Sequence, residues 1–145
     1  MSTDQGQENL LLFQPITIKS MTARNRIVVP PLCQYSAEDG IANDWHLVHL
    51  GSYARGGSGI VFVEATGVEA RGRITHGCLG IWNEEQAKAL VPLVNIIKDH
   101  GAVPAIQIAH AGRKAATQRP WNGLGALTDA DIAQGDVPWE VVGPS

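Results

Sequence analysis

Apolar residues recur along this chain with the periods of strands and helices. Short alternating segments within residues 11–23 predict a small β-hairpin. A β-branched run at residues 25–29, stopped by two prolines, predicts a buried strand that leads into a loop. The runs at residues 59–65 and 103–109 are almost uniformly apolar, which is typical of parallel strands covered on both faces.

Two segments between the predicted strands carry apolar residues at helical spacing. The first covers residues 45–55, with Asn43 or Asp44 as its N-cap. The second begins after Asn83 and is interrupted by Pro92, where we expect either a kink or a restart. Its predicted apolar stripe consists of Ala87, Leu90, Val91, Val94 and Ile97.

The predicted order is hairpin, strand, helix, strand, helix, strand, and then a segment at residues 110–145 that we interpret as a long loop. Alternation of strands and helices predicts an α/β fold with a parallel sheet, either doubly wound or closed into a barrel. The periodicity does not choose between these two. The first eleven residues are predicted to form a disordered tail, which leaves residues 12–145 as the folded part.

Composition narrows the classes of function. With 44% hydrophobic and 17% charged residues, the 145-residue chain is expected to be globular. Its net charge of −3 argues against nucleic-acid binding. No run approaches the ~20 apolar residues of a membrane span, and the polar start is unlike a secretory signal. We therefore expect a cytoplasmic protein in which Cys33 and Cys78 are free thiols.

Two motifs have simple structural explanations. The glycine cluster at residues 56–59 lies between a helix and a strand, whereas a phosphate-binding loop follows a strand, so we expect it to end the helix. His46 and His49 share a helix face, but no acidic or thiol partner stands at a helpful spacing. Structural hydrogen bonding is favoured over metal ligation, and no metal site is predicted.

Polar or reactive residues follow all three predicted core strands. Cys33 and Tyr35 follow the first, residues 64–66 end the second, and Gln107 and His110 end the third. In a (β/α)₈ barrel the carboxyl ends of the strands build the active site. Strands also become polar simply because they leave the core, and the pattern alone leaves both explanations open.

Five segments, read together, resemble the old yellow enzyme family of flavin-dependent ene-reductases. The sequence Pro-Pro-Leu-Cys-Gln-Tyr is similar to the bacterial branch of xenobiotic reductase A and the YqjM-type enzymes. The segments are residues 25–35, 44–46, 63–66, 72–75 and 106–114. The resemblance runs from about residue 12 to residue 145. It implies the N-terminal part of a (β/α)₈ TIM barrel, with a hairpin and about three βα units.

The resemblance also implies roles for the loop after the first strand. Pro30, Pro31, Leu32 and Cys33 match the segment that lines the ring of FMN. Cys33 matches a cysteine that tunes the flavin's reduction potential, with a buried core thiol as the alternative. Tyr35 matches a tyrosine that reaches over the flavin towards the substrate, with a purely packing role as the alternative.

Two residues at the ends of the later strands have implied cofactor contacts. Ala65 matches a backbone contact to FMN, and Gln107 matches a side-chain amide that bonds the pyrimidine edge. An amide suits that edge because it offers both a donor and an acceptor. Arg113 and Lys114 fit the family pattern, and a structural role is expected for them.

The implied activity is an FMN-dependent ene-reductase reaction. NADPH or NADH would reduce FMN, and the reduced flavin would pass hydride to an activated alkene such as an α,β-unsaturated carbonyl or nitro compound. A first alternative is a dienoyl-CoA reductase-like flavoenzyme, whose iron–sulfur cluster needs cysteines that this chain lacks. A second is a non-catalytic fragment or interaction domain.

The sequence holds only part of the machinery that the family implies. A barrel takes ~250 residues, and the chain supplies about three strands of eight. The substrate-activating histidines and the phosphate-binding loops lie in later strands of the family. We therefore expect this chain to be inactive alone, as a fragment, a truncated product or one piece of a split enzyme. The remainder of the barrel is the expected partner, and the complete protein is expected to be a homo-oligomer.

Overall fold

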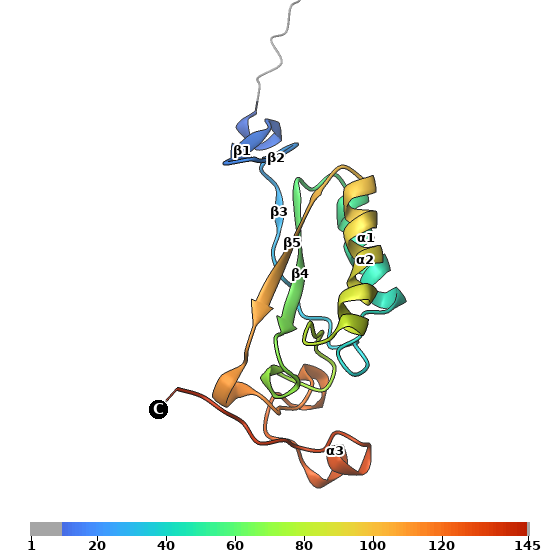
Figure 1. Ribbon diagram of the computed structural model, residues 1–145, viewed down its shortest axis with the longest axis vertical. Helices are drawn as coiled ribbons and strands as arrows, with labels where there is room; N and C mark the ends of the chain where they lie inside the picture. The colour runs from blue at the N-terminus through green and yellow to red at the C-terminus, as the bar shows by residue number, and fades with distance from the viewer. Residues whose placement is uncertain (1–9, 145) are drawn as a thin grey trace, which may run out of the picture.

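Three parallel strands form the centre of the fold (Figure 1). A computed structural model of the chain describes residues 10–144. The sheet has the order β3 (Val28–Val29), β4 (Ile60–Gly67) and β5 (Val103–Ala109), with β4 in the middle. The two longer strands lie where the sequence predicts them. The first is shorter than the predicted run at residues 25–29, because only its last two residues pair with β4.

A separate two-stranded hairpin precedes the sheet, as the alternating pattern predicts. Strand β1 (Ile16–Ile18) pairs antiparallel with β2 (Met21–Ala23). A 3₁₀ turn, η1 (Leu11–Phe13), leads into it. Most of the predicted disordered tail, residues 1–9, lies outside the described residues.

Both predicted helices are present with the expected N-caps. Helix α1 (Asp44–Arg55) begins after Asn43, whose side chain accepts a hydrogen bond from the backbone of Trp45. Helix α2 (Glu84–Asp99) begins after Asn83. Of the two outcomes expected at Pro92, a kink or a restart, the restart does not occur, since α2 continues through it. Pro92 and Lys88, whose carbonyl loses its helical partner, are both exposed residues of the helix.

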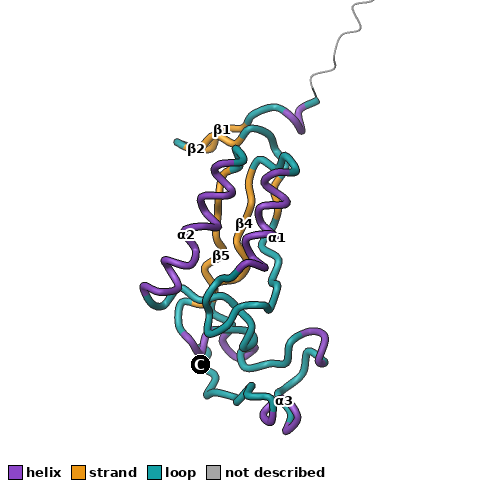
Figure 2. Tube along the Cα trace, turned by 90° about the vertical axis from the view of Figure 1, so that its right-hand side faces the viewer, coloured by secondary structure: helices purple, strands orange, loops and turns teal. Residues whose placement is uncertain are grey.

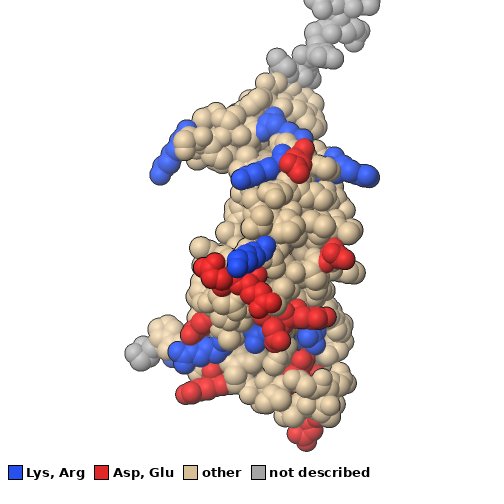
Figure 3. All heavy atoms as spheres, turned by 45° about the vertical axis from the view of Figure 1, so that its right-hand side comes forward, with Lys and Arg blue, Asp and Glu red and all other residues tan. Residues whose placement is uncertain are grey.

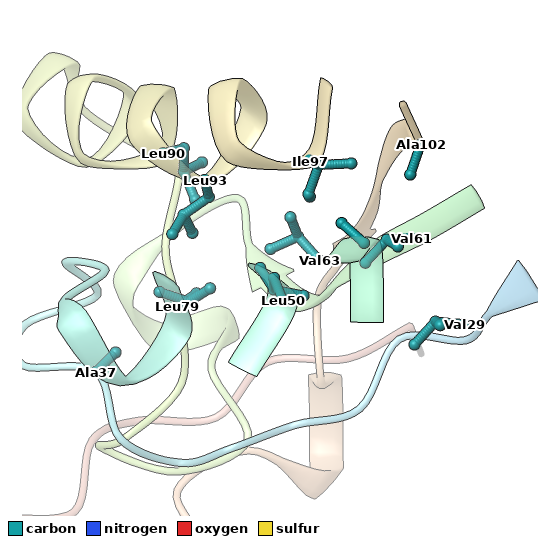
Figure 4. Packing of buried hydrophobic residues seen from close by; sticks show 11 residues of the cluster. Val29, Ala37, Leu50, Val61, Val63, Leu79, Leu90, Leu93, Ile97 and Ala102 are labelled. Carbon is teal, nitrogen blue, oxygen red and sulfur yellow. The ribbon is translucent and has the colours of Figure 1, made fainter. Parts of the chain in front are cut away.

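The two helices cover one face of the sheet, and the hydrophobic core lies between the layers (Figure 2). Side chains of α2 point towards β4 and α1 in the close-up of this core (Figure 4). The predicted stripe of α2 is correct only in part. Leu90 and Ile97 are buried, but Leu93 completes the core face and Val91 is 51% exposed. Helix α2 therefore carries apolar side chains, such as Val91, that do not contribute to this core.

The segment after β5 is not the featureless loop that its composition suggests. It contains two 3₁₀ turns, η3 (Gly112–Lys114) and η4 (Pro120–Asn122), and the short helix α3 (Asp129–Ala133). Side-chain hydrogen bonds compensate for the lack of a periodic apolar pattern. The buried Asp131 carboxylate accepts from Gln118 and from the backbone and hydroxyl of Thr128.

Acidic side chains lie near the beginnings of the two long helices and basic side chains near their ends. Most of the acidic side chains visible in Figure 3 lie in its lower half, where the two long helices begin. The first turns carry Asp44, Glu84 and Glu85, and the last turns carry Arg55 and Lys98, each matching the helix dipole. Within residues 10–144, no helix has the length and apolar character needed to cross a bilayer.

Candidate flavin-facing site

The carboxyl ends of β4 and β5 point towards the same end of the molecule (Figure 1), and the loop after β3 runs to that end. Ala65 of β4 is the register partner of Gln107 of β5, so their side chains are neighbours across the ladder. Ala65 is buried, whereas Gln107 is exposed. The fold thus brings together two residues that are 42 positions apart in the sequence.

The strand β4 is irregular next to Ala65. The register runs from Val63 opposite Ile106 to Ala65 opposite Gln107, which leaves Glu64 as the extra residue of a β-bulge. Its side chain is 3% exposed. One carboxylate oxygen, Oε2, accepts a hydrogen bond of 2.9 Å from the backbone nitrogen of Gln34. The bulge therefore joins β4 to the loop that carries Cys33 and Tyr35.

Tyr35 has a strained backbone. Its φ of 52° lies in the left-handed region, which a bulky residue occupies only when its surroundings enforce it. Gly77 packs against it so closely that a Cβ atom there would lie 2.2 Å from the Tyr35 carbonyl oxygen. The Tyr35 ring meets Trp121 edge to face, with 6.1 Å between ring centroids. The loop is thus held at a defined place above the strand ends.

Cys33 is a half-buried free thiol among these residues. Burial raises its pKa to about 11, and the nearby Glu64 carboxylate adds to the rise, while the Ala65 backbone opposes it by hydrogen bonding to the sulfur. The Tyr35 side chain also hydrogen-bonds the thiol, and burial raises the pKa of its hydroxyl. Cys33 is therefore protonated at neutral pH, unlike a nucleophilic cysteine.

Glu64 and His46 form a buried polar pair behind the loop. Their closest atoms, Oε2 and Nε2, lie 3.9 Å apart. Within the described part of the chain, neither His46 Nε2 nor Glu64 Oε1 has a hydrogen-bond partner. Burial raises the pKa of Glu64 to about 7 and lowers that of His46. The sequence places Glu64 at a strand end but assigns it no role, although a carboxylate within a buried apolar strand is a visible signal.

The other candidate residues have clear positions. Pro30 and Leu32 are exposed on the chain that leaves β3, and Pro31 is half-buried. His46 has the predicted structural role, because its Nδ1 accepts from the Asn43 backbone and closes the capping box of α1. The glycine cluster lies at the opposite end of β4, where Gly59 approaches the Asn25 carbonyl too closely for a side chain.

The groups at the strand ends suit the edge of a flavin ring. The Gln107 amide offers a donor and an acceptor and is exposed, and the small Ala65 beside it leaves room for a flat ring. The Cys33 thiol and the Tyr35 ring lie on the loop next to them. Among residues 10–144, the fit therefore concerns the ring of the cofactor.

The parallel strands and their covering helices are those of part of a (β/α)₈ fold, and the residues at the strand ends are of the kind expected in a flavin-binding oxidoreductase. The family model described as the NADH:flavin oxidoreductase / NADH oxidase family matches residues 11–136. The chain belongs to that family, and its resemblance to the old yellow enzymes is confirmed. The cofactors of the family are those implied by the sequence, FMN with NADPH or NADH as hydride donor.

Two curated relatives show the extent of the similarity. An NADPH dehydrogenase of Bacillus cytotoxicus is 50% identical over 109 residues, which are 74% of this chain and 32% of the relative. An NADH:flavin oxidoreductase of Gibberella zeae is 42% identical over 134 residues, 92% of this chain and 32% of the relative. The chain therefore spans about a third of the length of the curated relatives that it matches.

Solved structures share the fold as well. The old yellow enzyme homologue from Zymomonas mobilis matches 72% of this chain and 29% of its own, with a TM-score of 0.66 and 30% identity. A 2-naphthoyl-CoA reductase in complex with 2-naphthoyl-CoA matches 72% of this chain and 16% of its own, with a TM-score of 0.69 and 27% identity. The described residues are thus the N-terminal part of a TIM barrel, as predicted.

Proposed function

We propose that this chain supplies the flavin-facing part of an FMN-dependent ene-reductase, which reduces the C=C bond of α,β-unsaturated carbonyl or nitro compounds with NADPH or NADH. The observation that carries the proposal is the convergence of Cys33, Ala65 and Gln107 at one end of the sheet. When bound, FMN would accept hydride from the nicotinamide and deliver it to the alkene.

The residues of this chain have distinct tasks in the proposal. The Gln107 amide bonds the pyrimidine edge of the ring, the Ala65 backbone contacts the ring, and Pro30, Pro31 and Leu32 line it. Cys33 contacts the ring as a neutral thiol, which agrees with its raised pKa. Tyr35 faces the alkene, and the strain of its backbone is of the kind that clusters at functional sites.

The remainder of the barrel is the partner in this proposal. The chain covers 32% of its relatives, and it leaves an apolar groove of about 410 Å³ beside the edge strand β5. The groove is lined by residues of α2 that the core does not use, among them Ala87, Val91 and Val94, and by Pro104 and Ile106 of β5. These are the surfaces that the next strand and helix of a barrel would cover.

An anaerobic flavin assay tests the proposal on the full-length protein that contains this sequence. The purified protein is expected to contain FMN and to bleach on addition of NADPH. The yellow colour is expected to return with cyclohex-2-enone and not with cyclohexanone, which lacks the activated double bond. If the enone does not reoxidise the reduced flavin, the protein is not an ene-reductase. A colourless protein would contradict FMN binding.

The similarity to 2-naphthoyl-CoA reductase favours a second candidate, a flavoenzyme that reduces an unsaturated thioester. Such an enzyme of the dienoyl-CoA type carries an iron–sulfur cluster held by cysteines. Iron analysis of the same preparation distinguishes the two candidates, since the ene-reductase is expected to contain flavin without iron.

A further inference from the structure

Glu64 lies where the sheet itself gives no reason for a carboxylate. As the extra residue of the bulge it has no partner on β5, and the strand around it is apolar and buried. A buried carboxylate is unfavourable unless hydrogen bonds or charges compensate it. The backbone of Gln34 donates to Oε2, and the backbone of Leu79 also stabilises the carboxylate by hydrogen bonding, while Oε1 has no partner with ordinary hydrogen-bond geometry among the described residues. Pairing with β5 therefore does not account for this side chain, and its contacts lead to the loops beside the sheet.

The contacts of Glu64 connect it to the proposed flavin site. Its Oε2 accepts from the backbone of Gln34, which stands between Cys33 and Tyr35. A shift of the carboxylate would therefore move both candidate residues. Behind it, His46 accepts at Nδ1 from the Asn43 backbone, which leaves its proton on Nε2, the atom that faces Glu64.

We propose that Glu64, backed by His46, is a positioning residue for the flavin: it holds the loop that carries Cys33 and Tyr35 through the Gln34 amide, and its carboxylate adds a negative charge beside the Cys33 sulfur. This inference rests on the proposed function, because it assumes that Cys33 meets FMN. Glu64 itself does not touch the cofactor in this scheme and acts through Cys33.

The electrostatic surroundings of Cys33 agree with this role. Glu64 on β4 and Cys78 on the segment before α2 raise the pKa of Cys33 and disfavour its thiolate. Tyr35 on the same loop lowers it through a hydrogen bond. His46 of α1 faces Glu64. Because burial raises the pKa of Glu64 to about 7, its charge, and with it the influence on Cys33, changes near neutral pH.

Two substitutions separate the hydrogen bond from the charge. Glu64→Gln keeps an oxygen that accepts from the Gln34 amide and removes the charge, whereas Glu64→Leu removes both. Glu69→Gln is the matched control, because Glu69 is an exposed carboxylate near the end of the same strand, paired with Arg71 and His110. All three are made in the full-length protein.

The first readout is the alkylation rate of Cys33 by iodoacetamide, followed by peptide mass spectrometry, which needs no flavin chemistry. At about pH 9, Glu64→Gln is expected to react roughly threefold faster than the parent, the change produced by a half-unit fall in thiol pKa. Glu69→Gln is expected to match the parent. Equal rates in Glu64→Gln and the parent would overturn the inference, even if the protein is an active ene-reductase.

The second readout is the midpoint potential of the bound flavin. It is expected to become more positive in Glu64→Gln and to stay unchanged in Glu69→Gln, since a nearby negative charge disfavours reduction. The alkene KM is expected to rise in Glu64→Leu and to remain near the parent value in Glu64→Gln, which retains the loop. A parent protein without flavin would contradict the proposed function, while the alkylation result would still decide the role of Glu64. If Glu64→Leu fails to fold, the glutamine variant alone carries the test.

Discussion

The backbone nitrogen of Gln34 donates to Oε2 of Glu64 over 2.9 Å, joining a loop residue to a strand residue 30 positions later. This hydrogen bond holds the loop after β3 against strand β4. Cys33 and Tyr35 stand on either side of Gln34, so the buried carboxylate contributes to the position of both. The site is therefore organised by a residue that has no obvious place in a parallel sheet.

The raised pKa of Glu64 predicts a pH-dependent stability. The native state holds a proton that the unfolded chain releases between its ordinary pKa of 4.5 and about 7. Stability is therefore expected to fall as the pH rises through this window, by roughly 2–3 kcal/mol from Glu64. His46 acts in the opposite direction, because its lowered pKa makes the unfolded state take up the proton as the pH falls.

Comparison with Glu64→Gln isolates this contribution. Urea unfolding of the full-length protein at about pH 5 and about pH 8 is expected to show a smaller decline with pH in the variant than in the parent. Identical pH slopes in the two proteins would mean that Glu64 is ionised at its ordinary pKa in the native state.

Gly77→Ala is expected to displace the strained loop. The new Cβ would lie 2.2 Å from the Tyr35 carbonyl oxygen, so the loop must move. Because small misplacements of reacting groups are costly, flavin reoxidation by the alkene is expected to slow at least about tenfold in stopped-flow measurements. Gly125→Ala is the control, since its nearest contact is an ordinary 3.5 Å to Gln118. Equal rates in both variants would show that the position of Tyr35 does not matter.

Gln107→Leu is expected to weaken FMN binding. The leucine keeps the volume of the side chain and loses the donor and acceptor of the amide. Loss of about one net hydrogen bond corresponds to an FMN dissociation constant about tenfold higher, measured by the fluorescence of released flavin. Gln134→Leu, at an exposed position after α3, is expected to leave the constant unchanged.

Asn43→Ala is expected to destabilise the protein by about 1 kcal/mol. The substitution removes the acceptor of the Trp45 amide and the donor to the Ser36 carbonyl, which ties α1 to the site loop. Asn95→Ala is the comparison, because Asn95 is exposed within α2 and alanine favours helix there by a few tenths of a kcal/mol. Urea unfolding measures both, and an unchanged midpoint for Asn43→Ala would contradict the capping role.

Local patterns in the sequence were sufficient to predict the main elements. The apolar runs of β4 and β5, and the caps Asn43 and Asn83, are properties of neighbouring residues, and each was placed correctly. The five motifs then identified the barrel, which the periodicity could not distinguish from a doubly wound sheet. Features that depend only on residues close together in the sequence are therefore predicted well for this chain.

Properties that depend on distant contacts were not predicted. The bulge at Glu64 appears only when the β4–β5 register is known, because the local strand pattern is unbroken. The order of the segment around α3 comes from hydrogen bonds of Asp131 to Gln118 and Thr128, which leave no apolar period to detect. Val91 was assigned to the core because its helical face is apolar, yet that face lines the groove beside β5.

A crystal structure of the full-length protein with FMN tests the central claim most directly. The flavin ring is predicted to lie against the carboxyl ends of the strands, with the Gln107 amide on its pyrimidine edge, the Ala65 backbone in contact and the Cys33 sulfur beside the ring. A ring bound elsewhere, for example at the opposite end of β4 near residues 56–59, would contradict the account.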